Sequence, residues 1–121
     1  MNIQFDSVEP QQFNVFHVSQ IAPNTFVEGV AGLDFVVIPH RSVSEIHRHN
    51  HSDNVIYIVK GVATLILQDK LHEVRPGMRV IIPREVSHGF RTGEQELQFL
   101  SMQMPPILDP DRGIFDRDIV S

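Results

Sequence analysis

Short apolar runs separated by turn residues recur along most of this chain. The runs are rich in Val, Ile and Phe, and no stretch has the 3.6-residue periodicity of a long amphipathic helix. Parallel strands need crossover connections of about a dozen residues or more, and the gaps between these runs are shorter, so the strands should be antiparallel. The predicted strands are residues 32–39, 55–59, 62–68, 79–83, 89–92 and 97–104.

Turn residues mark the places where these strands should reverse. Lys60-Gly61 separates two apolar runs, which predicts an antiparallel hairpin, and Arg75-Pro76-Gly77 forces a further turn. A meander of hairpins that closes into a double-sheet barrel protects its strand edges. The sequence therefore predicts an all-β fold, an antiparallel jelly roll.

The length of 121 residues predicts one domain spanning residues 1–121, with the regular barrel at about 29–104. Residues 1–28 carry weaker strand signals at 13–16 and 25–27. The tail, 105–121, contains four apolar side chains that favour burial: Ile107, Leu108, Ile114 and Phe115. We expect these terminal segments to pack on the barrel or on the partner subunit of a homodimer.

Composition excludes several classes of function. The chain has no cysteine, which rules out disulfides, thiolate zinc sites and cysteine nucleophiles. Its net charge of −5, with scattered basic residues, argues against nucleic acid as a partner. No run approaches the ~18–20 apolar residues of a membrane span, and the N-terminus lacks the features of a signal peptide. We therefore expect a cytoplasmic protein whose partner is a small molecule.

Histidines form the most distinctive pattern in the sequence. His47 and His49 lie two positions apart, so on an extended strand their imidazoles share one face and can chelate a metal ion. Asp53 or Asn54, in the turn that follows, offers a third donor. His88 lies far along the chain, after a strand and a proline turn. Without sulfur ligands, such a site suits Fe, Mn, Ni, Zn or Cu as one divalent transition metal.

These two stretches resemble the two motifs of the cupin superfamily, G-x5-H-x-H-x(3,4)-E-x6-G and G-x5-P-x-G-x2-H-x3-N. Matches to the first motif are His47, His49 and Gly61, and matches to the second are Gly77, Pro83 and His88. The resemblance implies a small single-domain cupin barrel that binds a metal, and small cupins tend to form dimers.

Three positions depart from the motifs. Arg41 and Glu85 replace glycines, and Asn54 replaces the glutamate when the spacing is counted back from Gly61. Counting forward from His49 instead gives Asp53, and alternation allows only one of the two to share the ligand face. We favour Asn54. The predicted ligands are therefore His47, His49, Asn54 and His88, with Asp53 as the alternative to Asn54. Four neutral donors leave the charge of the metal uncompensated, which favours an anionic substrate.

Three functions fit this pattern. The first is an enzyme of isomerase or lyase type, in which the metal acts as a Lewis acid on a small carboxylate or sugar acid, as the resemblance to uronate-processing cupins implies. The second is an Fe(II)-dependent dioxygenase, and the third is a non-catalytic ligand-binding or sensor protein. No general base can be assigned from the sequence. Further candidates for the pocket are Tyr57, Phe90, Phe99, Gln98, Arg41 and Arg91, whereas His51, His17, His40 and His72 are predicted to lie outside the ligand set.

Overall fold

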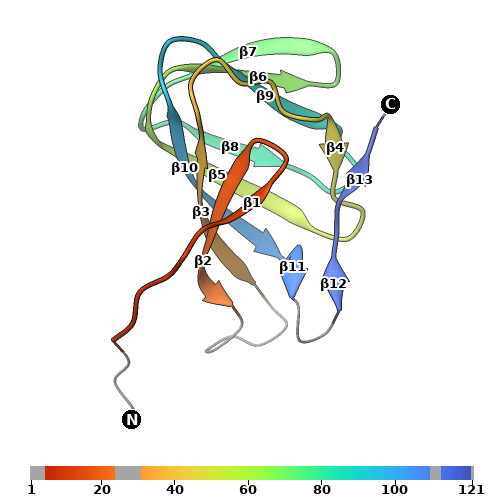
Figure 1. Cartoon of the computed structure of the whole chain (residues 1–121). Coiled ribbons are helices and arrows are strands. Elements are labelled where there is room, and N and C mark those ends of the chain that lie inside the picture. Colours follow the sequence, from red (N-terminus) through yellow and green to blue (C-terminus); the bar gives the residue numbers. More distant parts are fainter. Residues whose placement is uncertain (1–4, 24–30, 110–112, 121) are drawn as a thin grey trace.

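The computed structural model describes residues 5–23, 31–109 and 113–120, which form β-strands and contain no helix (Figure 1). Within these ranges there is accordingly no helix that could cross a membrane. The strand signal expected at 25–27 lies outside the described residues. The strands are β1 (Gln11–Phe13), β2 (Phe16–Pro23), β3 (Gly32–Ile38), β4 (His47–Arg48), β5 (Asp53–Lys60), β6 (Ala63–Leu67), β7 (Lys70–Val74), β8 (Arg79–Ile82), β9 (His88–Thr92), β10 (Leu97–Met104), β11 (Leu108–Asp109), β12 (Ile114–Phe115) and β13 (Asp118–Ile119).

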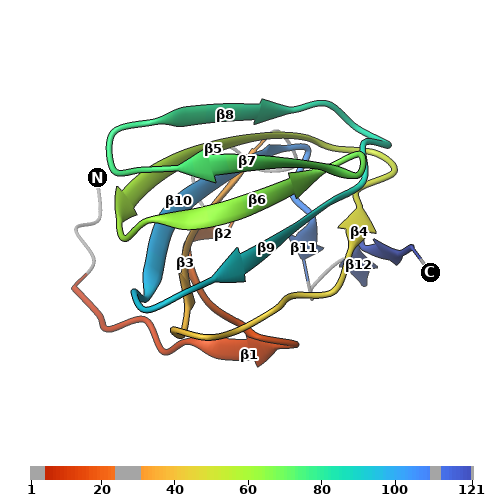
Figure 2. The ribbon, with the colours of Figure 1, turned by 90° about the horizontal axis from the view of Figure 1, so that it is seen from above.

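Two antiparallel sheets make up the fold (Figure 2). One has the order β1-β2-β3-β10-β5-β8 and the other has the order β13-β4-β9-β6-β7, while β11 and β12 pair as a separate ribbon. Buried side chains from both sheets form one hydrophobic cluster between them, with Ile38, Ile58 and Leu97 from the first sheet and Leu65 and Phe90 from the second. The predicted all-β antiparallel jelly roll is confirmed.

The hairpin predicted across Lys60-Gly61 is wrong. β5 pairs with β10 and β8, whereas β6 pairs with β7 and β9, so the chain passes from one sheet to the other at this point. Gly61 has a φ of 91°, and a β-carbon added to it would lie 2.0 Å from the carbonyl oxygen of Glu96, so the crossing leaves no room for a side chain at this position. An apolar run broken by glycine predicts a change of direction, but it does not say which strand becomes the new neighbour.

Residues 13–16 also differ from the prediction, because they form a hairpin turn instead of a strand. β1 ends at Phe13, β2 begins at Phe16, and Asn14 between them has a φ of 55°. Asparagine tolerates this left-handed conformation better than most residues. The turn places Phe13 and Phe16 at the same end of the barrel as the histidines described below.

The inner face of the six-stranded sheet changes from apolar to polar along its strands. In β3 the inward positions run from Ile38 and Val36 to Asp34, and in β5 they run from Ile58 and Ile56 to Asn54. β10 follows the same order, from Leu97 and Phe99 to Ser101 and Gln103. Because these three strands are neighbours, their polar ends meet at one end of the barrel.

Replacing Gly61 with alanine should destabilise the fold strongly. A β-carbon there would lie 2.0 Å from the carbonyl oxygen of Glu96, in addition to the strain of a φ of 91°. We expect the free energy of unfolding to fall by at least about 3 kcal/mol. Gly77→Ala is the matched control, because Gly77 has a φ of 90° but, apart from its two chain neighbours, no described residue places an atom within 4 Å of the added carbon. This substitution should cost about 1–2 kcal/mol. Equal losses in urea unfolding would contradict this account of the crossing.

Candidate functional site

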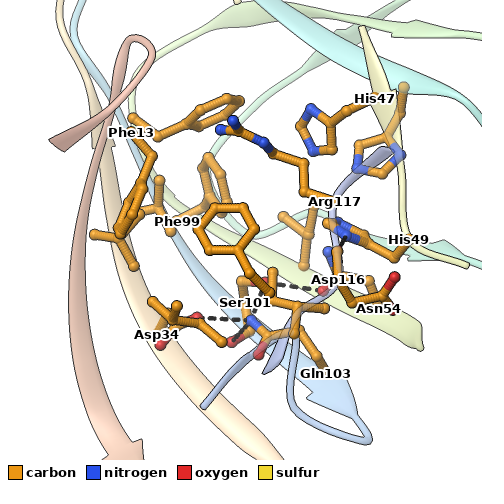
Figure 3. Close-up of a pocket in the computed structure, with 18 of the residues that line it drawn as sticks. Phe13, Asp34, His47, His49, Asn54, Phe99, Ser101, Gln103, Asp116 and Arg117 are labelled. Carbon is orange, nitrogen blue, oxygen red and sulfur yellow. Dashed lines mark hydrogen bonds between the residues drawn. The ribbon is translucent and has the colours of Figure 1, made fainter. Parts of the chain in front are cut away.

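Three buried histidines, His47, His49 and His88, meet at the polar end of the barrel. Figure 3 shows two of them, His47 and His49, on the cavity wall. His47 opens β4 and pairs in register with His88, which opens β9, while His49 follows directly after β4. The ring centroids lie 4.6 Å apart for His47 and His88, and 5.1 Å apart for each pair that includes His49. One ring nitrogen of each residue lies within 4.8 Å of the others. The structure thus brings His88 to a pair of histidines that precede it by 39 and 41 positions (88 − 49 = 39, 88 − 47 = 41).

Backbone carbonyls orient two of the three rings. His49 Nδ1 lies 2.6 Å from the carbonyl oxygen of Asp116, and His88 Nδ1 lies 3.0 Å from that of Val86. A carbonyl oxygen only accepts hydrogen bonds, so in both rings Nδ1 carries the hydrogen and Nε2 keeps the lone pair. His47 Nδ1 is buried and has no hydrogen-bond partner among the described residues.

All three imidazoles favour the neutral form. Burial lowers the pKa of His47 to about 2, and the neighbouring His88 and His49 lower it further. Burial also lowers the pKa of His88 to about 4 and lowers that of His49, although the carbonyl of Asp116 partly opposes the shift at His49. A neutral imidazole is the form that binds metals, so protons compete little for this cluster near neutral pH.

Asn54 and Asp53 point to opposite faces of β5. Asn54 is buried and lines the same cavity as the histidines, where its Oδ1 accepts a hydrogen bond of 2.9 Å from Ser101 Oγ. Asp53 instead forms an ion pair with Arg84, with 3.2 Å between Oδ2 and Nη2. Asn54, the residue reached by counting back from Gly61, is therefore the one whose side chain faces the cavity with the histidines.

The cavity beside the histidines has a volume of about 90 Å³ and is mainly apolar. Phenylalanines from both sheets and both terminal segments line it, namely Phe13, Phe16, Phe90, Phe99 and Phe115. Phe90 and Phe99 stack at 5.0 Å, and Phe13 contacts Phe115 at 5.3 Å.

Of the other residues considered from the sequence, Phe90 and Phe99 line this cavity. The remaining candidates do not: Tyr57 is half-exposed, Gln98 lies on the other face of β10, Arg91 is exposed and Arg41 pairs with Glu94. The four histidines expected outside the ligand set are likewise absent from the cavity lining, with His51, His40 and His72 exposed and His17 half-buried.

The C-terminal segment covers one side of the cavity and was not predicted to contribute to it. The carboxylate of Asp116 accepts hydrogen bonds from the backbone N–H groups of Asn50 (2.8 Å) and His51 (2.9 Å). Arg117 lines the cavity and forms an ion pair with Glu45 at 2.8 Å. β13 pairs with β4, so the segment holds the loop that carries His49. No sequence signal pointed to Asp116, because its partners are backbone groups.

Asp116→Ala should lower the free energy of unfolding by about 2–3 kcal/mol, because two backbone N–H groups lose a charged acceptor. Asp118→Ala is the control, two residues along the same segment. Asp118 pairs with Arg48 at the surface, and both side chains are more than 40% exposed, so its loss should cost no more than about 1 kcal/mol. Urea unfolding measures both changes, and equal costs would show that the Asp116 contacts contribute little.

The residues present fit a transition metal. Nitrogen ligands at metal distances of about 2.0–2.1 Å must lie about 3–4 Å from one another, and the nitrogens of this cluster are grouped within 4.8 Å before any adjustment. The unpartnered buried Nδ1 of His47 is a further sign that this group has a use other than packing. Three neutral nitrogens, together with the Asn54 oxygen, form a donor set without negative charge.

Comparison with known proteins shows similarity along the whole chain. The family model described as Cupin domain matches residues 34–102, more than half of the sequence. Protein SchB of Streptomyces halstedii is 29% identical over 119 residues, which cover 96% of this chain and 86% of SchB. The structure of the polyketide cyclase RemF from Streptomyces resistomycificus matches with a TM-score of 0.78 and 22% identity, covering 100% of this chain and 87% of RemF. The structure of a predicted oxalate decarboxylase from Thermotoga maritima matches with a TM-score of 0.75 and 16% identity, and the match covers 88% of this chain and 100% of that protein.

Proposed function

Because the chain belongs to the cupin family, with a match over residues 34–102, we propose that it is a metal-dependent enzyme acting on a small carbonyl compound. The observation that carries the proposal is the cluster of His47, His49 and His88 on the wall of an apolar cavity. These three residues would hold one divalent metal, with Asn54 as the fourth donor from the chain. When bound, such a metal supplies Lewis-acid chemistry: it polarises a carbonyl and stabilises the negative charge that develops on its oxygen.

The donor set supports chemistry in which negative charge develops on the substrate. Imidazoles and an amide bring no charge, so the protein leaves a divalent ion uncompensated, and an enolate or carboxylate gains most by approaching it. Arg117 is the basic residue of the cavity wall, but Glu45 already neutralises it. A substrate anion would therefore be recognised at the histidine cluster.

The lining supports a substrate with a flat apolar body. Five phenylalanines surround the space next to the histidines, whereas a sugar acid would present hydroxyl groups that need polar partners on every side. RemF, a structural neighbour, is described as a polyketide cyclase. We therefore favour an aromatic or polyketide-like ketone over a uronate, and a reaction that begins with proton removal next to the carbonyl and leads to isomerisation or ring closure.

Deuterium exchange into a ketone tests this function. Protein freed of metal by a chelator is reloaded with Zn²⁺, Mn²⁺, Ni²⁺ or, without oxygen, Fe²⁺, and is mixed with 2-tetralone in D₂O. We expect proton NMR to show loss of the signals next to the carbonyl about 100-fold faster than with the metal-free protein. His88→Ala is the control and should behave as the metal-free protein.

Other outcomes would favour the alternative functions. Oxygen consumption that requires Fe²⁺, with no exchange under anaerobic conditions, would favour the dioxygenase. Failure to take up any metal would contradict the proposal and favour a ligand-binding role. The homodimer and the cytoplasmic location remain predictions from the sequence.

A further inference from the structure

A row of buried polar side chains crosses the sheet on the cavity wall away from His47 (Figure 3). Gln103 Nε2 donates to Asp34 Oδ2 at 2.9 Å and to Ser101 Oγ at 2.8 Å, and Ser101 Oγ donates to Asn54 Oδ1 at 2.9 Å. All four residues line the cavity. The row therefore links a carboxyl group on β3 to the amide that faces the histidines.

Asp34 is the unusual member of this row. It occupies an inward position of β3, two residues from buried Val36, and is only 5% exposed. None of the ion pairs among the described residues includes it. A buried carboxyl without a cation is costly to ionise, so packing alone gives no reason for an aspartate here.

The groups around Asp34 leave it available for proton transfer. From the neighbouring strands it meets Gln20 of β2 and Ser101 and Gln103 of β10, none of which titrates. The remaining ionisable groups of the described cavity wall lie across the cavity from Asp34 and are the three histidines, Asp116 and Arg117. The Asp116 carboxylate is held by two backbone N–H groups, and Arg117 is paired with Glu45.

Burial raises the pKa of Asp34 to about 6, although the hydrogen bond from Gln103 partly opposes the shift. Near neutral pH both protonation states of this group are therefore accessible. A general base works best when its pKa lies near the working pH, since it can then both take up and release a proton.

We propose that Asp34 is the catalytic base of this site, and that Gln103 positions it. The inference rests on the proposed function. The Asp34 carboxylate takes a proton from the carbon next to the substrate carbonyl, and the electron pair of that C–H bond forms the carbon–carbon double bond of the enolate, leaving the negative charge on oxygen. In an isomerisation the protonated carboxyl returns the proton to another carbon of the enolate system. In a ring closure the enolate carbon instead forms a bond to a second carbonyl carbon of the substrate, the π electrons of that carbonyl move to its oxygen, and the protonated carboxyl gives its proton to this oxygen, which becomes a hydroxyl.

Exchange of 2-tetralone protons in D₂O, measured with the zinc-loaded protein, tests this role. Asp34→Asn keeps the shape and the hydrogen-bonding capacity but cannot accept a proton, so we expect exchange to fall about 100-fold or more. Zinc affinity, measured by calorimetry, should stay within about twofold, because Asp34 is outside the histidine cluster. Asp34→Glu retains a carboxyl and should keep measurable exchange, and Asp69→Asn, at an exposed turn, should leave the rate unchanged.

A pH profile separates a base from a residue that only supports the fold. In the zinc-loaded wild-type protein the exchange rate should rise with pH through an inflection set by the pKa of Asp34, which burial raises to about 6 in the metal-free protein and which the charge of the zinc ion opposes. In the wild-type protein the hydrogen bond from Gln103 lowers the pKa of Asp34. Gln103→Leu removes this bond, so the inflection should move to higher pH. Wild-type rates in Asp34→Asn, or an inflection that Gln103→Leu leaves in place, would overturn the role of Asp34 while the proposed function stands. Absence of exchange in the wild-type protein itself would overturn the proposed function.

Discussion

His88→Ala should weaken the binding of Co²⁺ at least about 100-fold, and the same loss is expected for His47→Ala and His49→Ala. Each variant removes one of three converging imidazoles, so the remaining two cannot enclose the ion. Co²⁺ is a suitable probe because its visible absorption shows when nitrogen ligands bind it with a low coordination number. The measurement is a spectroscopic titration of protein that has been freed of metal.

Two controls distinguish a lost ligand from a lost fold. His51→Ala removes an exposed histidine two positions after His49 and should leave the affinity within about twofold. His88→Gln keeps a side chain of similar size with one oxygen donor and should bind Co²⁺ more weakly than wild type but fold normally. If His51→Ala weakened binding as much as His88→Ala, the ion would lie outside the cluster, and the proposed site would be wrong.

The metal-free protein should lose stability sharply on acidification. In the unfolded chain a histidine takes up its proton near the ordinary pKa of 6.5, whereas in the fold His47 stays neutral down to about 2 and His88 down to about 4. The unfolded state therefore binds more protons below pH 6.5. The stability that the buried neutral histidines contribute is fully present above pH 6.5 and is lost as the pH is lowered.

Asp34 acts in the opposite direction. Its pKa is raised from 3.8 to about 6, so between these values the fold binds one more proton than the unfolded chain, and the stability it contributes is lost as the pH rises through 6. When the pH falls from about 7 to 4.5, His47 and His88 together lower the free energy of unfolding by about 5 kcal/mol, whereas Asp34 raises it by about 2 kcal/mol. The net loss is about 3 kcal/mol, and the lowered pKa of His49 makes this loss larger.

Urea unfolding with a chelator at the two pH values measures this loss. His47→Gln removes one of the titrating groups and should make the loss smaller by about 2–3 kcal/mol. His72→Gln, which replaces an exposed histidine of β7, should leave the loss unchanged. A stability that does not change between the two pH values would contradict the burial of three neutral imidazoles.

Most strands could be predicted because their alternation is regular. The prediction for 97–104 matches β10 (Leu97–Met104), and those for 32–39 and 79–83 each end one residue beyond β3 and β8. The same alternation distinguishes Asn54 from Asp53, since the side chains of Ile56 and Ile58 already mark the inward face of β5. The spacing of the histidines indicated that His88 belongs with His47 and His49, and the resemblance to cupins is confirmed by the family match.

Two motif positions that depart from glycine show what the backbone requires there. Arg41 has a φ of 53° and Glu85 a φ of 70°, so both residues occupy the left-handed region that glycine adopts most easily. The family pattern at these positions describes a backbone conformation, and this chain keeps that conformation with a different side chain.

Contacts between distant segments could not be predicted. The exchange of sheets at Gly61 depends on packing against Glu96, 35 residues away (96 − 61 = 35), and the role of Asp116 depends on backbone groups of the loop after β4. Asp34 is a single acidic residue in an apolar run, and only its neighbours on β10 show that its side chain is buried within a polar row.

Anomalous diffraction from crystals soaked in a zinc solution tests the central claim most directly. Data collected on both sides of the zinc absorption edge locate the ion without reference to activity. The account predicts one strong peak enclosed by the ring nitrogens of His47, His49 and His88, with Asn54 beside it. A cluster without any peak, or zinc bound solely by exposed side chains at the surface, would contradict it.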